Sequence, residues 1–544
     1  MNGDKLPFAI TLDPGSSLHN HTGSWRSERP VYVDRMPPCN NACPAGENIQ
    51  NWLFHAESGD YAAAWQALMR DNPMPGVMGR VCYHTCETAC NRGQLDESVS
   101  IHAVERFLGD YALREGLVPQ VDAPPSGKRV LIVGAGPSGL SAAYHLTRLG
   151  HAVTIREAGP MAGGMMRFGI PKYRLPRDVL DAEIARILAM GVTLELNTKV
   201  EDIDAAFAEG FDAIFTAVGA HLAKRTAIPA HAAGRILDAV TLLKQVELGE
   251  APQLGRRVIV YGGGNTAMDV ARTVRRMGAD DAMIVYRRSA KEMPAHAIEA
   301  QEAEDEGVLI HWLRTITQID ATTFTVEKMR IDADGRPQPT GEFETLEADT
   351  LVLALGQDAD TGFLTRVPGV AVARDGVVAV DGQMMTGRPG LFAGGDMVPS
   401  ERTVTVAVGH GKKAARNIDA FLRGGQYEKG AQPELAGYDR LNTWYYDDAP
   451  QSVQDQLSMV RRQSGFDEVT KGLTEETALF EARRCLSCGN CFECDNCYGV
   501  CPDNAVIKLG PGNRFRIDYD YCKGCGICAT ECPCGAIQMV PEQA

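Results

Sequence analysis

The cysteines constrain this chain more than any other feature, because eleven of its sixteen lie between residues 485 and 544. Two runs there have the form C-x2-C-x2-C-x3-C-P, one starting at Cys491 and one at Cys522. Such a duplicated run holds two 4Fe-4S clusters. A disulfide-rich domain or a pair of zinc knuckles gives no reason for two identical runs. The sequence therefore predicts a ferredoxin-like α+β domain over residues 485–544.

The two runs divide into two ligand sets, because the fourth cysteine of each run binds the cluster of the other run. A cubane needs four thiolates that converge from several directions, and one tight loop supplies only three. The first set is Cys491, Cys494, Cys497 and Cys532, and the second is Cys501, Cys522, Cys525 and Cys528.

Composition sets the broad class. A length of 544 residues predicts roughly three or four domains, and a net charge of -16 argues against nucleic acid or an anionic membrane as the main partner. Neither a membrane-spanning apolar run nor the apolar core of a signal peptide is present. Cysteines in cluster spacing fit a reducing compartment. We therefore expect a cytoplasmic protein without a membrane or nucleic-acid partner.

The N-terminal region divides into an arm and a helical domain. Residues 1–38 are rich in Gly, Pro, Ser and charge, and Trp25 stands beside Arg26; we expect an extended arm that docks on a partner, the alternative being a disordered tail. Residues 39–120 combine a helical period with five cysteines, which cannot fill two cubanes alone. These are Cys39, Cys43, Cys82, Cys86 and Cys90.

A dinucleotide-binding unit begins at residue 128, after a Pro-rich linker. A predicted strand, a glycine turn, a helix and a second strand ending at Glu157 follow in order. The glycines let the backbone approach a pyrophosphate at a helix N-terminus, and the acid is placed to accept a hydrogen bond from a ribose hydroxyl. The turn consists of Gly134, Ala135, Gly136, Pro137, Ser138 and Gly139.

A second unit follows at residues 257–286, and its strand ends in Arg287 and Arg288 instead of an acid. Guanidinium groups attract a 2'-phosphate, so this unit favours NADP over NAD. The alternative is that both arginines pair with Glu292 or Glu299. The turn residues are Gly262, Gly264, Asn265, Thr266 and Ala267.

The order of these units resembles the glutamate synthase small-subunit family, shared with dihydropyrimidine dehydrogenase and the flavin subunit of electron-bifurcating transhydrogenases. The resemblance implies that FAD binds residues 121–245 and 385–425 and that NAD(P) binds residues 246–384. Short strands at 214–219 and 351–356 would be the crossover links. His296 and His410 are expected to be structural, because hydride transfer between nicotinamide and flavin needs stacking, not a protonating side chain. Further flavin contacts implied are Gly164, Met165, Arg167, Gly395 and Asp396.

The same resemblance implies two clusters at the N-terminal cysteines. One takes Cys43, Cys82, Cys86 and Glu105. The family's first cysteine pair is missing upstream of Cys39, but residues 481–488 match the family sequence pattern that contains this pair. We therefore expect a fourth cluster that joins the chain ends, the alternative being that it is lost and these thiols are structural or free. Its ligands would be Cys39, Cys90, Cys485 and Cys488, which leaves Cys534 unassigned.

Residues 22–30 and 517–539 look like the two ends of the ferredoxin-like delta subunit of 2-oxoacid:ferredoxin oxidoreductases. The fold class expected is a multi-domain α/β and α protein with a helical Fe-S domain, two Rossmann-like domains, a linker at 426–484 and the ferredoxin domain. The implied function is NAD(P) reduction with electrons from thiamine diphosphate subunits, with ferredoxin as a further partner. The alternatives are a glutamate synthase small-subunit-type NADPH oxidoreductase and a free-standing electron carrier with an inactive flavin site.

Overall fold

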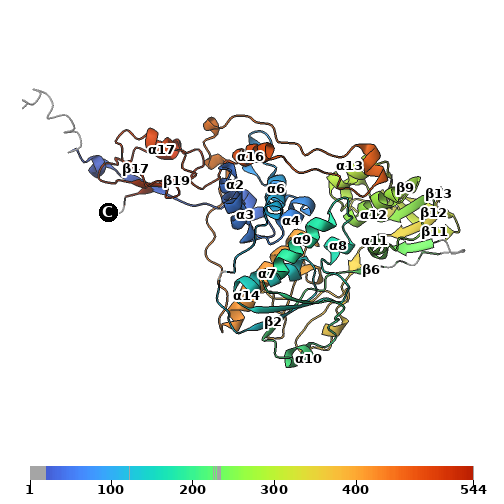
Figure 1. Ribbon diagram of the computed structural model, residues 1–544. Coiled ribbons are helices and arrows are strands. Elements are labelled where there is room, and N and C mark those ends of the chain that lie inside the picture. Colours follow the sequence, from blue (N-terminus) through green and yellow to red (C-terminus); the bar gives the residue numbers. More distant parts are fainter. Residues whose placement is uncertain (1–19, 122, 225, 227, 230–234, 543–544) are drawn as a thin grey trace, which may run out of the picture.

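The computed structural model describes residues 20–121, 123–224, 226, 228–229 and 235–542, so half of the expected arm, residues 1–19, lies outside the described residues. Four parts follow one another across the molecule: the C-terminal cysteine-rich domain, a helical domain and two sheet domains (Figure 1). Within the described chain, no helix combines the length and apolarity needed to cross a bilayer.

The helical domain is built on a core formed by Trp52, Leu53, Leu68 and Leu108. Within each helix the buried residues recur every three or four positions, as in Tyr61, Ala64 and Leu68, so each helix turns one apolar face inward. Helix α16 (Glu475–Arg483), from far along the sequence, completes this core with Ala478 and Ala482. The other elements are α1 (Pro38–Ala42), α2 (Ile49–Glu57), α3 (Tyr61–Met69), α4 (Pro75–Val81), α5 (Thr85–Thr88), η3 (Asn91–Gln94) and α6 (Ile101–Arg114).

The first sheet domain contains a five-stranded parallel sheet in the order β16-β5-β2-β3-β4. Its central strands are continuous apolar runs because helices cover both faces. The strands are β2 (Arg129–Val133), β3 (Ala152–Arg156), β4 (Thr193–Glu195), β5 (Ala213–Thr216) and β16 (Leu391–Ala393); the helices are α7 (Pro137–Arg148), α8 (Met165–Phe168), α9 (Arg177–Leu188), α10 (Ile203–Ala208), η5 (Gly362–Leu364), η6 (Gly395–Met397) and α14 (Val404–Leu422).

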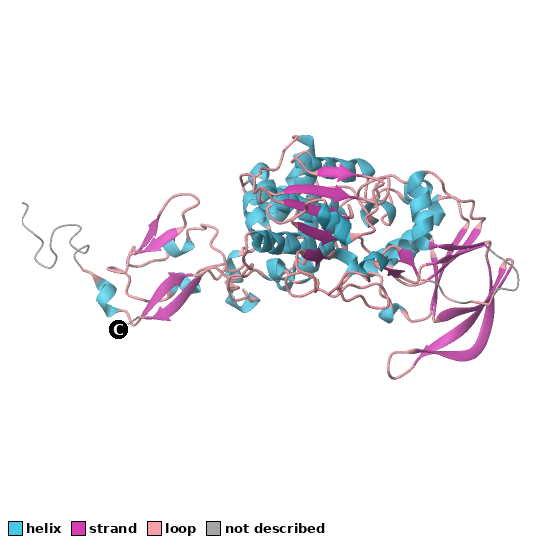
Figure 2. Ribbon diagram, turned by 90° about the horizontal axis from the view of Figure 1, so that it is seen from below, coloured by secondary structure: helices cyan, strands magenta, loops and turns pink. Residues whose placement is uncertain are grey.

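The second sheet domain contains another parallel sheet, in the order β10-β9-β8-β14-β7. An antiparallel three-stranded sheet, β11-β12-β13, packs beside it (Figure 2). The strands are β7 (Arg235–Asp238), β8 (Arg257–Tyr261), β9 (Asp281–Tyr286), β10 (Leu309–Trp312), β11 (Arg314–Asp320), β12 (Thr323–Ile331), β13 (Pro337–Glu347) and β14 (Thr350–Leu353); the helices are α11 (Ala239–Leu248), α12 (Asn265–Arg276), η4 (Ala290–Glu292) and α13 (Ala297–Asp305).

The observed domain boundaries differ from the expected ones. Strands β5 and β14, expected to be crossover links, each pair between two strands inside a sheet. The links are instead β6 (Leu222–Ala223) and β15 (Gln357–Asp358), which pair with each other. Strand β7 adds an edge to the second sheet before residue 246, and residues 359–384 pack into the first domain's core through Leu364 and Val378. Both segments lack a motif, so only packing reveals where they belong.

The C-terminal domain incorporates the described part of the arm. Strand β1 (Glu28–Tyr32) pairs antiparallel with β19 (Ile537–Pro541). Arg26 Nε lies 2.6 Å from a carboxylate oxygen of Glu542, and the Tyr519 hydroxyl donates to the Pro30 carbonyl at 2.8 Å. Residues 20–38, expected to dock on a partner, thus dock on this chain's own C-terminal domain. The remaining elements are η2 (Thr22–Trp25), α17 (Asn496–Gly499), β17 (Val506–Lys508), β18 (Phe515–Ile517) and α18 (Ile527–Thr530).

Residues 426–484 form a strap that touches all four parts. The backbone N–H of Asn442 donates to the Pro533 carbonyl at 3.1 Å, and Arg462 Nε donates to Glu306 in the second sheet domain at 3.1 Å. Strap elements before α16 are η7 (Tyr438–Arg440), η8 (Thr443–Tyr445) and α15 (Met459–Ser464). The motif-poor segment therefore connects domains rather than merely separating them.

Candidate redox site

A cavity of about 660 Å³ lies where the helical domain and the two sheet domains meet. This volume is typical of a ligand or cofactor site. Most of the residues expected to bind the flavin line it, together with the start of α12. The predicted residues among its lining are Gly134, Gly136, Pro137, Ser138, Glu157, Gly164, Met165, Asn265, Thr266, Gly395 and Asp396.

The first glycine turn has the geometry that a bound pyrophosphate needs. Gly134 has φ of +107° and lies against the Ala217 carbonyl, and a Cβ at Gly139 would lie 2.0 Å from the Gly134 carbonyl oxygen. A Cβ at Gly136, in contrast, would meet nothing nearer than 3.9 Å. Thus one glycine makes the turn, one packs helix on strand, and Gly136 leaves its backbone open to the cavity. The second unit repeats this arrangement, with Gly262 against Ala354 and nothing within 4 Å of a Cβ at Gly264.

Two carboxylates face the same cavity. Glu157 accepts hydrogen bonds from the backbone N–H of Ala135 at 2.8 Å and of Gly159 at 2.7 Å, so its position is fixed. Burial raises the pKa of Asp396 to about 6, although Arg402 opposes the shift. The Gly395 N–H donates to His410 Nδ1 at 3.2 Å, so His410 holds the loop that carries Asp396.

Arg167 differs from its expected role. Its guanidinium is buried, donates to the Ala162 carbonyl at 2.6 Å and pairs with Asp181, and it is not part of the cavity wall. A backbone carbonyl and a carboxylate satisfy it, so it stabilises the segment at 162–168, which ends in α8. Ala267 is likewise buried inside the second domain's core.

Arg287 and Arg288 follow β9 and lie outside the cavity wall. In the described chain neither forms an ion pair with Glu292 or Glu299. Glu292 accepts a hydrogen bond from the Ser289 N–H at 3.3 Å, and Glu299 pairs with Arg174. The pairing that would have explained both arginines without a nucleotide is therefore absent.

The first N-terminal ligand set adjoins the cavity. Burial and the charge of Glu105 raise the pKa of Cys82 to about 12, and burial followed by Glu47 raises the pKa of Cys43. Cys82 Sγ accepts a hydrogen bond from Thr405 Oγ1 at 3.2 Å. Neighbours of Cys82 and of Thr405 on both sides line the cavity: Val81, Tyr83, Thr403, Val404 and Ala407. This set therefore lies at the cavity wall.

Glu47 was missed by the sequence reasoning. Asn72 Nδ2 donates to Glu105 Oε1 at 2.6 Å and to Glu47 Oε1 at 3.1 Å, and both carboxylates are buried. Burial and the charge of Asp71 raise the pKa of Glu47 to about 7. The only signal in the sequence was an acid soon after Cys43, which is too weak to single out.

The second N-terminal set brings the chain ends together. Cys39, Cys90, Cys485 and Cys488 line one small cavity. Burial, followed by the charges of Cys485, Cys90 and Cys488, raises the pKa of Cys39. Crowded buried thiols resist ionisation unless a cation compensates them, and the iron of a cluster at this set would supply that compensation.

The two C-terminal sets are also grouped as the crossover rule predicts. Cys501, Cys522, Cys525 and Cys528 line a single cavity. Burial, followed by Cys497 and Cys532, raises the pKa of Cys491 to about 11. The unassigned Cys534 lies 3.7 Å, sulfur to sulfur, from Cys532, and its hydrogen bond lowers the pKa of Cys532 to about 6. Cys534 therefore neighbours a predicted ligand.

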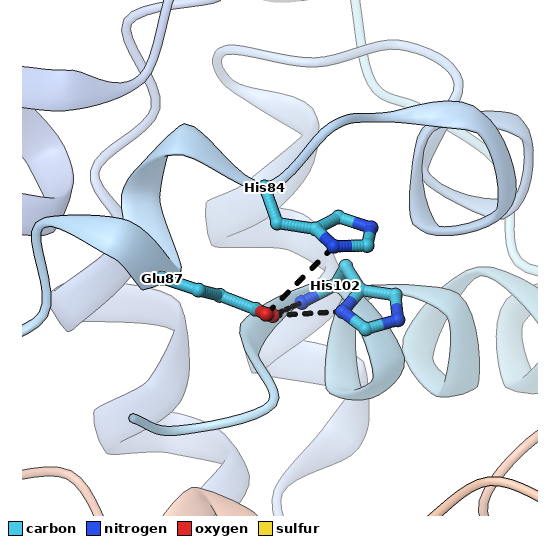
Figure 3. A group of neighbouring side chains, drawn as sticks. All are labelled: His84, Glu87 and His102. Atoms are coloured by element: carbon cyan, nitrogen blue, oxygen red, sulfur yellow. Dashed lines mark hydrogen bonds and ion pairs between the residues drawn. The ribbon is translucent and has the colours of Figure 1, made fainter. Parts of the chain in front are cut away.

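His84 and Glu87, from the segment that carries Cys82, Cys86 and Cys90, form a polar group with His102 (Figure 3). His102 Nδ1 lies 2.7 Å from Glu87 Oε1, and its Nε2 lies 2.9 Å from Gln454 Oε1. The two imidazoles are stacked with centroids 3.6 Å apart and planes 14° apart. Parallel rings cannot both aim an in-plane lone pair at one ion, so this arrangement suits a hydrogen-bonded support for the cysteine loop. Burial, then His102, lowers the pKa of His84 to about 4.

The fold and this cavity define a flavin- and pyridine nucleotide-dependent oxidoreductase that carries iron–sulfur clusters. Residues 128–411 match the pattern described as pyridine nucleotide-disulphide oxidoreductase, and the chain belongs to that family. Residues 22–117 match dihydropyrimidine dehydrogenase domain II, 4Fe-4S cluster, and residues 515–538 match a 4Fe-4S binding domain. The predicted fold class and the expected FAD-dependent oxidoreductase activity are confirmed.

Three relatives show how far the similarity extends. The chain is 37% identical to the NADP(+)-dependent formate dehydrogenase subunit beta of Moorella thermoacetica over 83% of this chain and 70% of that protein. It is 32% identical to the NADPH-Fe(3+) oxidoreductase subunit beta of Geobacter sulfurreducens, covering 84% and 76%. It is 32% identical to the glutamate synthase [NADPH] small chain of Azospirillum brasilense, covering 71% and 87%. The resemblance to the glutamate synthase small subunit is thereby confirmed.

Proposed function

We propose that this chain is the electron-transfer and NAD(P)-reducing subunit of a coenzyme A-acylating 2-oxoacid:NAD(P)+ oxidoreductase. Its cofactors are FAD, NADP in preference to NAD, and four 4Fe-4S clusters. Its partners are thiamine diphosphate-containing subunits, with ferredoxin as a further electron carrier. The observation that carries the proposal is the position of Cys82, which places one cysteine set at the wall of the cavity that fits FAD.

The four cysteine sets are ordered as an electron path. The C-terminal domain lies at one end of the molecule, and both Cys494 and Cys525 are exposed there (Figure 1). The set of Cys39, Cys90, Cys485 and Cys488 follows, because Cys488 immediately precedes the C-terminal runs. The set containing Cys82 ends the path at the cavity. Electrons from a partner therefore enter at the exposed end and leave through the nucleotide domain.

When bound, FAD supplies the conversion between single electrons and a hydride. The chain's own residues hold and orient the two dinucleotides. The N-termini of α7 and α12 offer backbone N–H groups to the two pyrophosphates. Two backbone N–H groups hold Glu157 in a position to accept a hydrogen bond from a ribose hydroxyl. Arg287 and Arg288 remain available for a 2'-phosphate, which favours NADP.

The choice of a 2-oxoacid partner rests on the pairing of β1 with β19. This pairing joins the two delta-subunit-like phrases, which are far apart in the sequence, into one sheet. Trp25 stays 66% exposed beside that sheet, as a partner contact requires. The second candidate is an NADPH-oxidising subunit that feeds another enzyme, and the names of the Geobacter sulfurreducens and Azospirillum brasilense relatives favour it.

Iron content and flavin reduction test the proposal. We expect about sixteen iron atoms per chain and loss of the flavin absorbance on anaerobic addition of NADPH, faster than with NADH. With catalytic subunits present, a 2-oxoacid and coenzyme A should together drive NADP+ reduction. A flavin that NADPH does not bleach would exclude the function. The absence of NADP+ reduction in the presence of a 2-oxoacid and coenzyme A would favour the second candidate.

A further inference from the structure

The loop that joins Cys82 to Cys86 makes a direct contact with the nucleotide domain. Tyr83 stacks on His296, with centroids 3.6 Å apart and planes 10° apart. Asn265 Nδ2 donates to the Tyr83 hydroxyl at 2.7 Å. The His296 N–H donates to Asn265 Oδ1 at 2.9 Å, so the three residues form one connected group.

Both partners of Tyr83 stand at helix starts. Asn265 is the first residue of α12, whose N-terminus is expected to receive the dinucleotide pyrophosphate, and His296 is the N-cap of α13. Arg174, from the first sheet domain, pairs with Asp269 on α12 and Glu299 on α13. Tyr83 and Arg174 both line the cavity. The second domain is thus held at the same two helices by the cysteine loop and by the flavin domain.

The loop itself is fixed on its other side. Cys82 Sγ accepts hydrogen bonds from Thr405 Oγ1 at 3.2 Å and from the His84 N–H at 3.4 Å. Thr405 belongs to α14 of the flavin domain. Tyr83 therefore stands on a segment anchored to one domain and contacts another.

We propose that Tyr83 is a positioning residue for hydride transfer, setting the orientation of the nucleotide domain over the flavin through Asn265 and His296. This inference rests on the proposed function. In the described part of the links between the two sheet domains, the regular structure is the short β6–β15 pair, so this pair alone does not fix that orientation. Hydride transfer depends steeply on the placement of the reacting atoms, and small displacements lower the rate strongly.

The test compares Tyr83→Phe, Tyr83→Ala and His296→Ala with the wild-type holoprotein. Tyr83→Phe removes the hydroxyl but keeps the ring, and Tyr83→Ala removes both. Tyr111→Phe is the matched control, because Tyr111 packs on Phe107 in the helical domain, away from the cavity. The readouts are the limiting rate of flavin bleaching at saturating NADPH, the dissociation constant of NADP+, and the flavin and iron contents.

We expect Tyr83→Phe to slow the limiting rate about three- to tenfold, as loss of one hydrogen bond allows, and Tyr83→Ala to slow it further, toward about a hundredfold. The limiting rate of the His296→Ala variant should also be lower than that of the wild type. The NADP+ dissociation constant should change less than about twofold, since the second domain alone binds the phosphates, and Tyr111→Phe should match wild type.

Wild-type limiting rates in both Tyr83 variants, with normal iron and flavin, would overturn the inference. A dissociation constant that rises in step with the fall in rate would also overturn it, because Tyr83 would then be a binding residue. If the wild type itself does not react with NADPH, the proposed function fails instead, so the two failures are distinguishable.

Discussion

At the scale of single residues, the proposed function assigns the choice between NADPH and NADH to Arg287 and Arg288. Neither is neutralised by Glu292 or Glu299 in the described chain, and a charge-assisted hydrogen bond contributes about 1.5–3 kcal/mol. We expect Arg288→Ser to raise the KM for NADPH about tenfold or more and to leave the KM for NADH unchanged. Steady-state kinetics with both nucleotides measures this.

The control is Arg330→Ser, because Arg330 is an exposed arginine on β12 of the same domain. If Arg288→Ser raised both KM values equally, the arginine would support the fold rather than read the 2'-phosphate.

The roles of residues in motifs with a fixed spacing were predictable from the sequence. The roles of residues that depend on tertiary contacts were not. Glycines 134, 136 and 139 and the cysteine runs carry geometry that the backbone or a cubane demands, so spacing alone identifies them. Arg167 sits in a matching phrase, yet Asp181 and a carbonyl satisfy its guanidinium. Glu47 reaches Asn72 and the first cysteine set only through the fold. Such contacts have no local sequence signal.

At the scale of elements, one helix is capped by a residue of another domain. Helix α4 starts at Pro75, which has no N–H, and the next two N–H groups, of Gly76 and Val77, donate to Glu183 of α9 at 2.9 and 3.0 Å. Glu183 thereby fastens the helical domain to the flavin domain. Helix N-termini and caps of this kind typically contribute about 1 kcal/mol.

Glu183 should make the stability of this junction depend on pH. Burial raises its pKa from 4.5 to about 7, against the opposing effect of Arg186. Between these values the folded state holds a proton that the unfolded state has released, so stability falls as pH rises from 4.5 to 7, by on the order of 3 kcal/mol. We expect Glu183→Gln to flatten that dependence in thermal unfolding measured from pH 5 to pH 8.

The matched control is Glu201→Gln, because the side chain of Glu201 is 77% exposed in the same domain. A slope in the Glu183→Gln protein equal to that of the wild type would assign the pH dependence to other groups.

Elements were predictable where the pattern was local. The β-α-β units follow from glycine turns and apolar runs, whereas the pairing of β1 with β19 connects opposite ends of the chain and only the delta-subunit resemblance hinted at it. Strand β7 and helix α16 were not anticipated, because each is short and gains its stability from a sheet edge or a core built by distant residues.

At the scale of the whole molecule, the set of Cys39, Cys90, Cys485 and Cys488 is the point at which the chain closes on itself. Helix α16 packs in the helical domain immediately before Cys485, and the strap runs back from there across the other domains. A cluster at this set would fasten the C-terminal end of the strap's last helix to the helical domain, because metal binding free energy adds to the stability of the elements it joins.

We expect Cys488→Ser to lower the iron content from about sixteen to about twelve atoms per chain and to speed tryptic cleavage of the strap at Arg461 and Lys471. Cys525→Ser is the matched control, since it removes a ligand at the exposed end of the C-terminal domain and should lower the iron content without exposing the strap. Cleavage rates equal in both variants would mean that α16 packing alone holds the ends together. About twelve iron atoms already in the wild type would mean that this cluster does not exist, and the electron path would then lack the step between the C-terminal domain and the cavity.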